Sequence, residues 1–194
     1  ASDVYKRQVE RHLVQDKVGC QDQLMAAMGG FNLVEFRTEE DIIVSRVAIS
    51  PDRLAEFEAH IFIVFTGIKR KAANVVEKQL QKMADNTEIL KEMRKMVDKG
   101  WDILTSNQSL TSFGELLHQA WLAKRSLDTG ISNTEIDEIY RLGIDAGALG
   151  GKLLGAGAGG FMLFFAPPEV HPQLQSVFMN HQILSLKINA PGSV

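Results

Sequence analysis

Residues 150–161 read GGKLLGAGAGGF, and this stretch decides the interpretation of the chain because half of its positions are glycine. It follows a segment with apolar residues at helical spacing and precedes the continuous apolar run FMLFFA at residues 161–166. A tight turn from a helix to a strand needs only one or two glycines that can adopt positive φ. A loop with glycine at positions 155, 157, 159 and 160 instead lets backbone N–H groups converge on an anion. We therefore expect a helix-to-strand loop that handles phosphate.

Other interpretations of the same glycines fit less well. Gly155, Gly157 and Gly160 satisfy G-x-G-x-x-G, but in the dinucleotide-binding fold a strand enters the glycines and a helix leaves, which reverses the order expected here. A Walker loop would need glycine where Ala146 stands and Ser or Thr where Leu153 stands. A plain turn, in which the glycines only permit positive φ, stays open.

The composition sets wide limits on fold and partners. The chain has 194 residues, of which 45% are apolar and 23% are charged, enough for one domain or for one domain and part of another. Its net charge of -3 and pI near 6.0 give no basic surplus, so we expect neither nucleic acid nor a membrane as partner. The single cysteine, Cys20, and the lack of a signal peptide or long apolar run fit a cytoplasmic protein. The five histidines show no metal-ligand spacing, so we assign no metal site to them.

Apolar periodicity predicts an α+β fold with helices on one face of a mainly antiparallel sheet. The run HIFIVFTG at residues 60–67 has the length and continuity of a buried central strand, and Pro51-Asp52 before it reads as a break. The expected strands are residues 31–37, 41–49, 60–67, 161–166 and 183–188, and the expected helices are 21–28, 69–83, 87–104, two that begin near 112 and 132, and 169–179.

Two of these helices carry a predicted capping box. Ser112 with Glu115, and Ser132 with Glu135, have the S/T-x-x-E spacing that satisfies free N–H groups at a helix start. Trp121 lies in the apolar stripe of the first of them, and we expect it in the core.

A second polar cluster, Gln21-Asp22-Gln23, stands just before small residues and Gly29-Gly30. A carboxylate in this setting can cap the short helix, as Asp22 or Gln21 would. It can also orient or deprotonate an acceptor hydroxyl in phosphoryl transfer. The residues alone leave both roles open.

Several long segments resemble the GHMP kinases, in particular the branch that acts on a heptose 7-phosphate. GGKLLGAGAGGFMLFF resembles the third signature motif of this family, K-L-x-G-A-G-G-G-G. The similarity extends through VGCQDQLMAAMGGFNLVEF, FTGIKRKA, GELLHQAWLAKRSLDTGISNTEIDEIY and AGALGGKLLGAGAGGF, and covers about residues 9–190.

The resemblance implies a kinase with two parts and an active site between them. Residues 1–55 would be the tail of a ribosomal-S5-like N-terminal domain that carries the catalytic Asp loop. Residues 56–194 would be a ferredoxin-like GHMP kinase C-terminal domain. The principal nucleotide loop of the family would precede residue 9, so we expect the chain to be the C-terminal portion of a kinase, and to be inactive by itself.

The resemblance also assigns roles to individual residues. Asp22 matches the catalytic base toward the anomeric hydroxyl. The third-motif loop would lie against the nucleotide phosphates through Gly155, Ala156, Gly157, Ala158, Gly159 and Gly160. The expected substrate-binding residues are Gln21, Gln23, Thr66, Gly67, Arg70 and Lys152. Arg70 is equally consistent with a solvated first-turn residue. Ala158 replaces a family glycine, which we expect to be tolerated if its φ is negative and its methyl points away from phosphate.

The activity implied is an ATP-dependent sugar kinase that converts D-glycero-D-manno-heptose 7-phosphate to the 1,7-bisphosphate. ATP and Mg²⁺ would be its cofactors and a small phosphosugar its substrate. Another anomeric sugar kinase, such as an L-fucokinase or a galactokinase-like enzyme, is the first alternative. A binding remnant that keeps the fold without chemistry is the second. The oligomeric state, including a homodimer, stays open.

Overall fold

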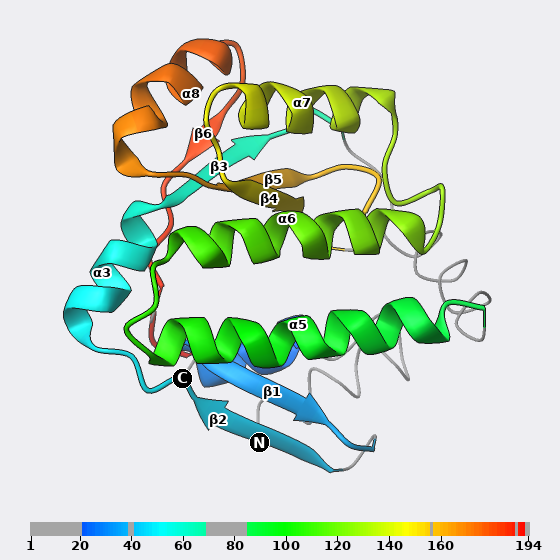
Figure 1. Cartoon of the computed structure of the whole chain (residues 1–194), viewed down its shortest axis with the longest axis vertical. Coiled ribbons are helices and arrows are strands. Elements are labelled where there is room, and N and C mark those ends of the chain that lie inside the picture. The colour runs from blue at the N-terminus through cyan, green and yellow to red at the C-terminus, as the bar shows by residue number, and fades with distance from the viewer. Residues whose placement is uncertain (1–20, 39–40, 69–84, 156, 189, 193–194) are drawn as a thin grey trace. The chain divides into compact units, whose positions relative to one another are not determined.

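The structure is a computed structural model that describes residues 21–38, 41–68, 85–155, 157–188 and 190–192 (Figure 1). The chain divides into two compact units: unit 1 is Ala1–Ser50 with Lys187–Val194, and unit 2 is Pro51–Leu186. Within the described ranges, no helix combines the length and the apolarity needed to span a membrane.

Unit 1 contains a short helix and a hairpin. Helix α2 spans Gln21–Met28, and strands β1 (Asn32–Phe36) and β2 (Ile42–Arg46) pair antiparallel. The end of the chain joins this unit, because the Gly30 N–H donates a 2.8 Å hydrogen bond to the Ala190 carbonyl. The predicted helix at 21–28 and the predicted strand pair are therefore confirmed.

Unit 2 is built on an antiparallel sheet in the order β4-β5-β3-β6. This order is that of a ferredoxin-like sheet, with the first strand along the chain between the third and the fourth. The strands are β3 (Ile61–Phe65), β4 (Gly150–Leu153), β5 (Phe161–Phe165) and β6 (Ile183–Leu184). The central position of β3 and the strand at FMLFF confirm two predictions, whereas the last strand is shorter than the predicted 183–188.

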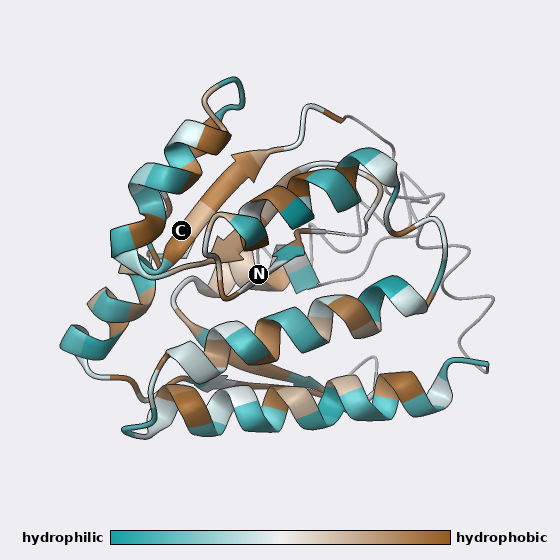
Figure 2. Ribbon diagram, turned by 45° about the horizontal axis from the view of Figure 1, so that its top comes forward, coloured by the Kyte–Doolittle hydropathy of each residue, from teal (hydrophilic) through white to brown (hydrophobic). Residues whose placement is uncertain are grey.

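The helices of unit 2 follow the predicted pattern with one addition. They are α3 (Pro51–Ala59), α5 (Thr87–Thr105), α6 (Thr111–Ser126), α7 (Thr134–Asp145), the 3₁₀ turn η2 (Pro168–Val170) and α8 (His171–Val177). Helix α3 occupies the segment that we read as a break. The predicted helix at 69–83 lies outside the described residues. In Figure 2, α5, α6 and α7 carry alternating hydrophilic and hydrophobic bands, as the amphipathic spacing predicts.

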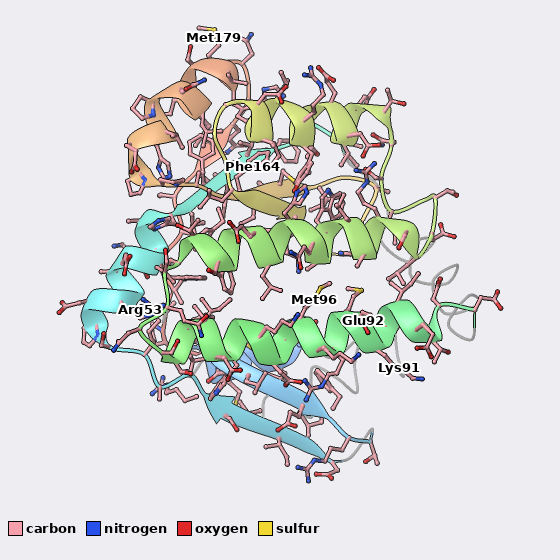
Figure 3. The ribbon with its side chains drawn as sticks, viewed as in Figure 1. Arg53, Lys91, Glu92, Met96, Phe164 and Met179 are labelled. Atoms are coloured by element: carbon pink, nitrogen blue, oxygen red, sulfur yellow. The ribbon has the colours of Figure 1, made fainter. Side chains whose placement is uncertain are left out.

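Helices contact both faces of the sheet, so the expectation of helices on one face was wrong. Phe164 and Phe165 follow one another in β5 and therefore point to opposite faces. The Phe164 ring contacts Tyr140 of α7 and Phe178 beyond α8, and Figure 3 shows Phe164 beside α7. The Phe165 ring contacts rings of α3 and α6. The ferredoxin-like helices α7 and α8 thus share one face, while α3 and α6 supply additional cover on the other.

Two glycines allow α6 to pack directly on β4. A Cβ atom on Gly150 would lie 2.0 Å from the Gly114 carbonyl oxygen and 2.7 Å from the His118 nitrogen. Trp121, two turns along the same helix, is completely buried, which confirms its predicted place in the core.

Arg53 connects α3 to the end of α5. Its guanidinium donates to the carbonyls of Ile103 and Gln108 at 2.7 and 2.6 Å, and to that of Leu104 at 3.2 Å (Figure 3). These are carbonyls at or just beyond the last turn of α5, where a cation complements the helix dipole.

Helix α7 begins with a cap different from the predicted one. The Asn133 side chain accepts a 2.9 Å hydrogen bond from the Ile136 N–H, whereas Ser132 donates its hydroxyl to Asp137 at 2.5 Å. At α6 the residue before the helix is Leu110, which makes no side-chain cap. Both predicted capping boxes were therefore wrong, although both helices form.

We expect Asn133→Ala to lower the free energy of unfolding by about 1 kcal/mol, because the Ile136 N–H loses its acceptor. Urea unfolding of the purified chain measures this change. Asn107→Ala, at an exposed loop position, is the matched control and should change stability by less than about 0.5 kcal/mol. Equal effects of the two substitutions would contradict the cap.

Candidate active site: the glycine loop and its lysines

The glycine loop connects two strands, not a helix and a strand. Strand β4 enters it and β5 leaves it, and the Leu154 N–H closes the hairpin with a 2.8 Å hydrogen bond to the Phe161 carbonyl. The expected helix-to-strand connection was therefore wrong, because GGKL reads as loop until its pairing with β5 is known. No helix follows the glycines, so the dinucleotide motif still lacks its required context.

Hydrogen bonds fix the loop against two neighbouring segments. The Ala158 N–H donates to the Ile131 carbonyl at 2.9 Å, and the Gly160 N–H donates to the Ile68 carbonyl at 3.0 Å. Thr66 donates both its N–H and its hydroxyl to the Gly160 carbonyl, at 2.9 and 2.8 Å. The Thr66 side chain is buried, and the contact that the structure shows for it is this hydrogen bonding to the loop. A role of Thr66 in binding the sugar stays a prediction.

Ala158 has a positive φ, not the negative value under which we expected alanine to be tolerated. Its φ is +64°, a left-handed value that costs an alanine about 1 kcal/mol. Its side chain is 1% exposed and belongs to the hydrophobic core of unit 2. The condition of a negative φ, under which we expected alanine to be tolerated, is therefore not met, and burial of the methyl together with the hydrogen bond to Ile131 favours this conformation.

Close packing explains two of the loop glycines and leaves two unexplained. A Cβ atom would lie 3.0 Å from the Ile131 backbone at Gly157 and 2.6 Å from the Ile68 carbonyl at Gly159. At Gly155 and Gly160 it would meet nothing within 4 Å, and both have positive φ. The turn interpretation thus accounts for Gly157 and Gly159. At Gly155 and Gly160 the loop also presents bare backbone to open space.

The N–H groups of the loop divide in the same way. Those of Ala158 and Gly160 are already bonded within the unit. Those of Gly155, Gly157 and Gly159 donate to no other described residue. Of the six residues predicted to bind phosphate, these three are thus the ones whose N–H groups have no acceptor among the described residues.

Two lysines accompany the loop. Lys124 of α6 donates a 2.7 Å hydrogen bond from Nζ to the Gly155 carbonyl, and Lys152 lies in β4. Burial, and secondarily the charge of Lys152, lower the pKa of Lys124 to about 8. Burial also lowers the pKa of Lys152. Lys152 was predicted from its motif, but Lys124 was missed. Its position three residues after the buried Trp121 is the signal that could have placed it near the core-facing side of the helix.

We expect Lys124→Met to raise the free energy of unfolding at pH 7, by an amount on the order of 1 kcal/mol after solvent screening. The ordinary lysine pKa is 10.5 and the folded pKa is about 8, so between these values the unfolded chain binds more protons. The charged lysine therefore destabilises the fold below pH 8, and this penalty disappears as the pH rises to 10.5.

Urea unfolding of both proteins at several pH values measures this difference, which should shrink across that window. Lys91→Met removes an exposed lysine that pairs with Glu88 and should show no such trend. A Lys124 difference that does not depend on pH would contradict the assignment.

A buried tyrosine, Tyr140, lies beside β4, the strand that carries Lys152. The Tyr140 hydroxyl lies 2.7 Å from His118 Nδ1. Burial raises the pKa of Tyr140 to about 12, so it stays neutral. The hydroxyl is also close enough to the Gly151 backbone N–H for that group to act on the Tyr140 pKa, in the direction of lowering it. Tyr140 therefore positions the strand and is not a proton donor for chemistry.

The remaining predicted residues belong partly to the other unit. Gln21 is exposed at the start of α2, and Asp22 is the second residue of that helix. Gly67 has a φ of +79° and open space around it. The side chains of Asp22 and Gln23, and the whole of Arg70 and Ala156, lie outside the described residues.

A shallow groove of about 490 Å³ lies elsewhere in unit 2. Its main charged groups satisfy each other, since Arg125 donates to Asp137 at 2.8 Å. It is lined by Leu122, Arg125, Ser126, Asp128, Thr129, Ser132 and Asp137. Among the described side chains, no three of His, Cys, Asp or Glu gather as metal ligands, so no residue is assigned to Mg²⁺.

Residues 89–179 match the family model described as GHMP kinases C terminal. This range holds most of α5, the helices α6–α8, both strands of the hairpin and the glycine loop. The chain belongs to the GHMP kinase family, and unit 2 has the fold of its C-terminal domain.

Relatives agree with this assignment. D-glycero-alpha-D-manno-heptose 7-phosphate kinase of Campylobacter jejuni is 36% identical over 166 residues, 83% of this chain and 48% of that protein. Bifunctional fucokinase/GDP-fucose pyrophosphorylase of Arabidopsis thaliana is 27% identical over 180 residues, 88% of this chain and 17% of that protein. The crystal structure of a D-glycero-D-manno-heptose 1-phosphate kinase from Bacteroides thetaiotaomicron covers 98% of this chain with a TM-score of 0.69 at 22% identity, and the chain covers 52% of it. The chain thus spans about half or less of these proteins.

Proposed function

We propose that the chain is the C-terminal portion of an ATP-dependent kinase that phosphorylates the anomeric hydroxyl of D-glycero-D-manno-heptose 7-phosphate. The observation that carries this proposal is the 36% identity with the heptose 7-phosphate kinase over 83% of the chain. The product would be the 1,7-bisphosphate, and the enzyme would work in the cytoplasm on small-molecule ligands.

The proposed chemistry divides the work between residues of the two units. The N–H groups of Gly155, Gly157 and Gly159 donate to phosphate oxygens of the nucleotide. Asp22 accepts the proton of the anomeric hydroxyl as that oxygen bonds to the γ-phosphorus. The bond from the γ-phosphorus to the bridging oxygen breaks, and ADP leaves with the electron pair. Bound Mg²⁺ neutralises charge on the phosphates in such reactions.

The substrate is tested in a full-length kinase that contains this chain as its C-terminal portion. Coupled ADP release should saturate with heptose 7-phosphate and stay at background with L-fucose and galactose. Saturation with L-fucose and no response to the phosphosugar would reject the substrate assignment. The 194-residue chain alone should give negligible turnover, and robust activity from it would overturn the assignment as a portion of an enzyme.

An L-fucokinase is the second candidate, because the fucokinase relative matches 88% of the chain at 27% identity. The two candidates differ in charge at the sugar, since only the heptose substrate carries a phosphate. A phosphate-binding cation near the sugar, such as Arg70, favours the heptose. We therefore expect Arg70→Met to raise KM for the phosphosugar far more than KM for ATP.

A further inference from the structure

Lys124 and Lys152 have no acidic partner in the described part of the chain, unlike the exposed Lys91 and Lys95. Lys91 and Lys95 pair with Glu88 and Glu92 one turn away, at 2.7 and 2.6 Å. Lys124 instead bonds a neutral carbonyl, and Lys152 has no hydrogen bond or ion pair with any described residue.

Partly buried ammonium groups that no acidic group neutralises destabilise a fold. Burial is the main cause of the lowered pKa of each lysine, and the charge of Lys152 adds to it at Lys124. A bound anion would remove both the repulsion and the burial penalty.

The surroundings supply further donors for an anion. A lysine ammonium has three N–H donors, and Lys124 uses one on the Gly155 carbonyl, which leaves two. The Gly155 and Gly157 N–H groups donate to no described residue, and a Cβ at Gly155 would meet nothing within 4 Å. Lysine ammonium groups and free backbone N–H groups together form the usual donor set for phosphate.

We propose that Lys124, together with Lys152 and the Gly155 end of the loop, forms a binding site for a phosphoryl group. The hydrogen bond from Lys124 to the Gly155 carbonyl positions both the ammonium and the loop for this ligand. Which molecule carries the phosphate, the nucleotide or a phosphosugar, rests on the proposed function. The existence of the site does not rest on it.

The test uses pyrophosphate as probe and the 194-residue chain itself. Calorimetric titration should show binding to the wild-type chain, and Lys124→Met should weaken it by at least about tenfold. Lys91→Met makes the same change in net charge at an exposed position and should weaken binding less than about twofold. Circular dichroism confirms that the variants are folded.

A second measurement needs no variant. Pyrophosphate should slow acetylation of Lys124 and Lys152 by acetic anhydride, measured by mass spectrometry, and leave the rates of Lys91 and Lys95 unchanged. Equal pyrophosphate affinity in Lys124→Met and the wild-type chain, no binding to the wild-type chain, or equal protection of all four lysines would each overturn the proposal.

Competition identifies the source of the phosphate. Displacement of pyrophosphate by ADP but not by heptose 7-phosphate assigns the site to the nucleotide, and the converse assigns it to the sugar. Both results support the site. Failure of the full-length enzyme to phosphorylate any sugar would remove the proposed function while leaving pyrophosphate binding that depends on Lys124 in place.

Discussion

Asp22→Asn is expected to lower kcat of the full-length kinase by about 10³-fold, with KM for ATP nearly unchanged. An amide nitrogen replaces one carboxylate oxygen, and the neutral side chain cannot accept the proton of the anomeric hydroxyl. Asp22 lies in the first turn of α2, so the effect on folding should be within about 1 kcal/mol. Steady-state kinetics together with urea unfolding separates the two effects.

The matched control is Asp41→Asn, which makes the same chemical change at an exposed position of unit 1. It should leave kcat within about twofold of the wild-type value. Loss of less than about tenfold in Asp22→Asn would remove Asp22 as the general base. A helix-stabilising role would then be the better interpretation of this residue.

Gly150→Ala is expected to be the most damaging single substitution in the sheet. Its methyl group would lie 2.0 Å from a backbone oxygen of α6, so the backbone of the helix or of the strand would have to shift. We expect a loss of at least about 3 kcal/mol in unfolding free energy, enough to leave much of a marginally stable chain unfolded. Circular dichroism and urea unfolding measure this.

For the same chemical change in α5, Gly100→Ala, we expect the opposite effect on stability. There the added methyl would meet side-chain atoms of Leu116 and Phe113 at 3.6 and 3.7 Å, which is ordinary contact. Alanine is the better helix former by about 1 kcal/mol, so this variant should be more stable than wild type. If both substitutions changed stability alike, the close packing of α6 on β4 would be contradicted.

Sequence patterns predicted the elements whose signal is local. The long apolar run of β3 and the regular apolar spacing of α5 were recognised because many residues agree. Helix α3 was missed because Pro51-Asp52 was read as a break, although proline is favoured at the first position of a helix. Strand β4 was missed because its two glycines carry no strand propensity, and its pairing partner follows only after the loop.

The candidate site was predicted in the same uneven way. The glycine motif could be found from the sequence because its spacing is compact. The helix face of Lys124 could be inferred from Trp121, but its contact with Gly155 could not, because the two are 31 residues apart and only the packing of α6 on β4 brings them together. The left-handed φ of Ala158 depends likewise on a tertiary hydrogen bond, to Ile131, which no local pattern encodes.

The hydroxyl of Tyr140 has a consequence for self-association. An outer strand of a sheet exposes N–H and carbonyl groups that can recruit a strand from another molecule, the first step in edge-to-edge aggregation. At β4 the Tyr140 hydroxyl lies close to the Gly151 N–H, and α6 packs against the adjacent Gly150, so both groups restrict the pairing of an incoming strand there. Strand addition at the margin of the sheet that carries the glycine loop is therefore restricted.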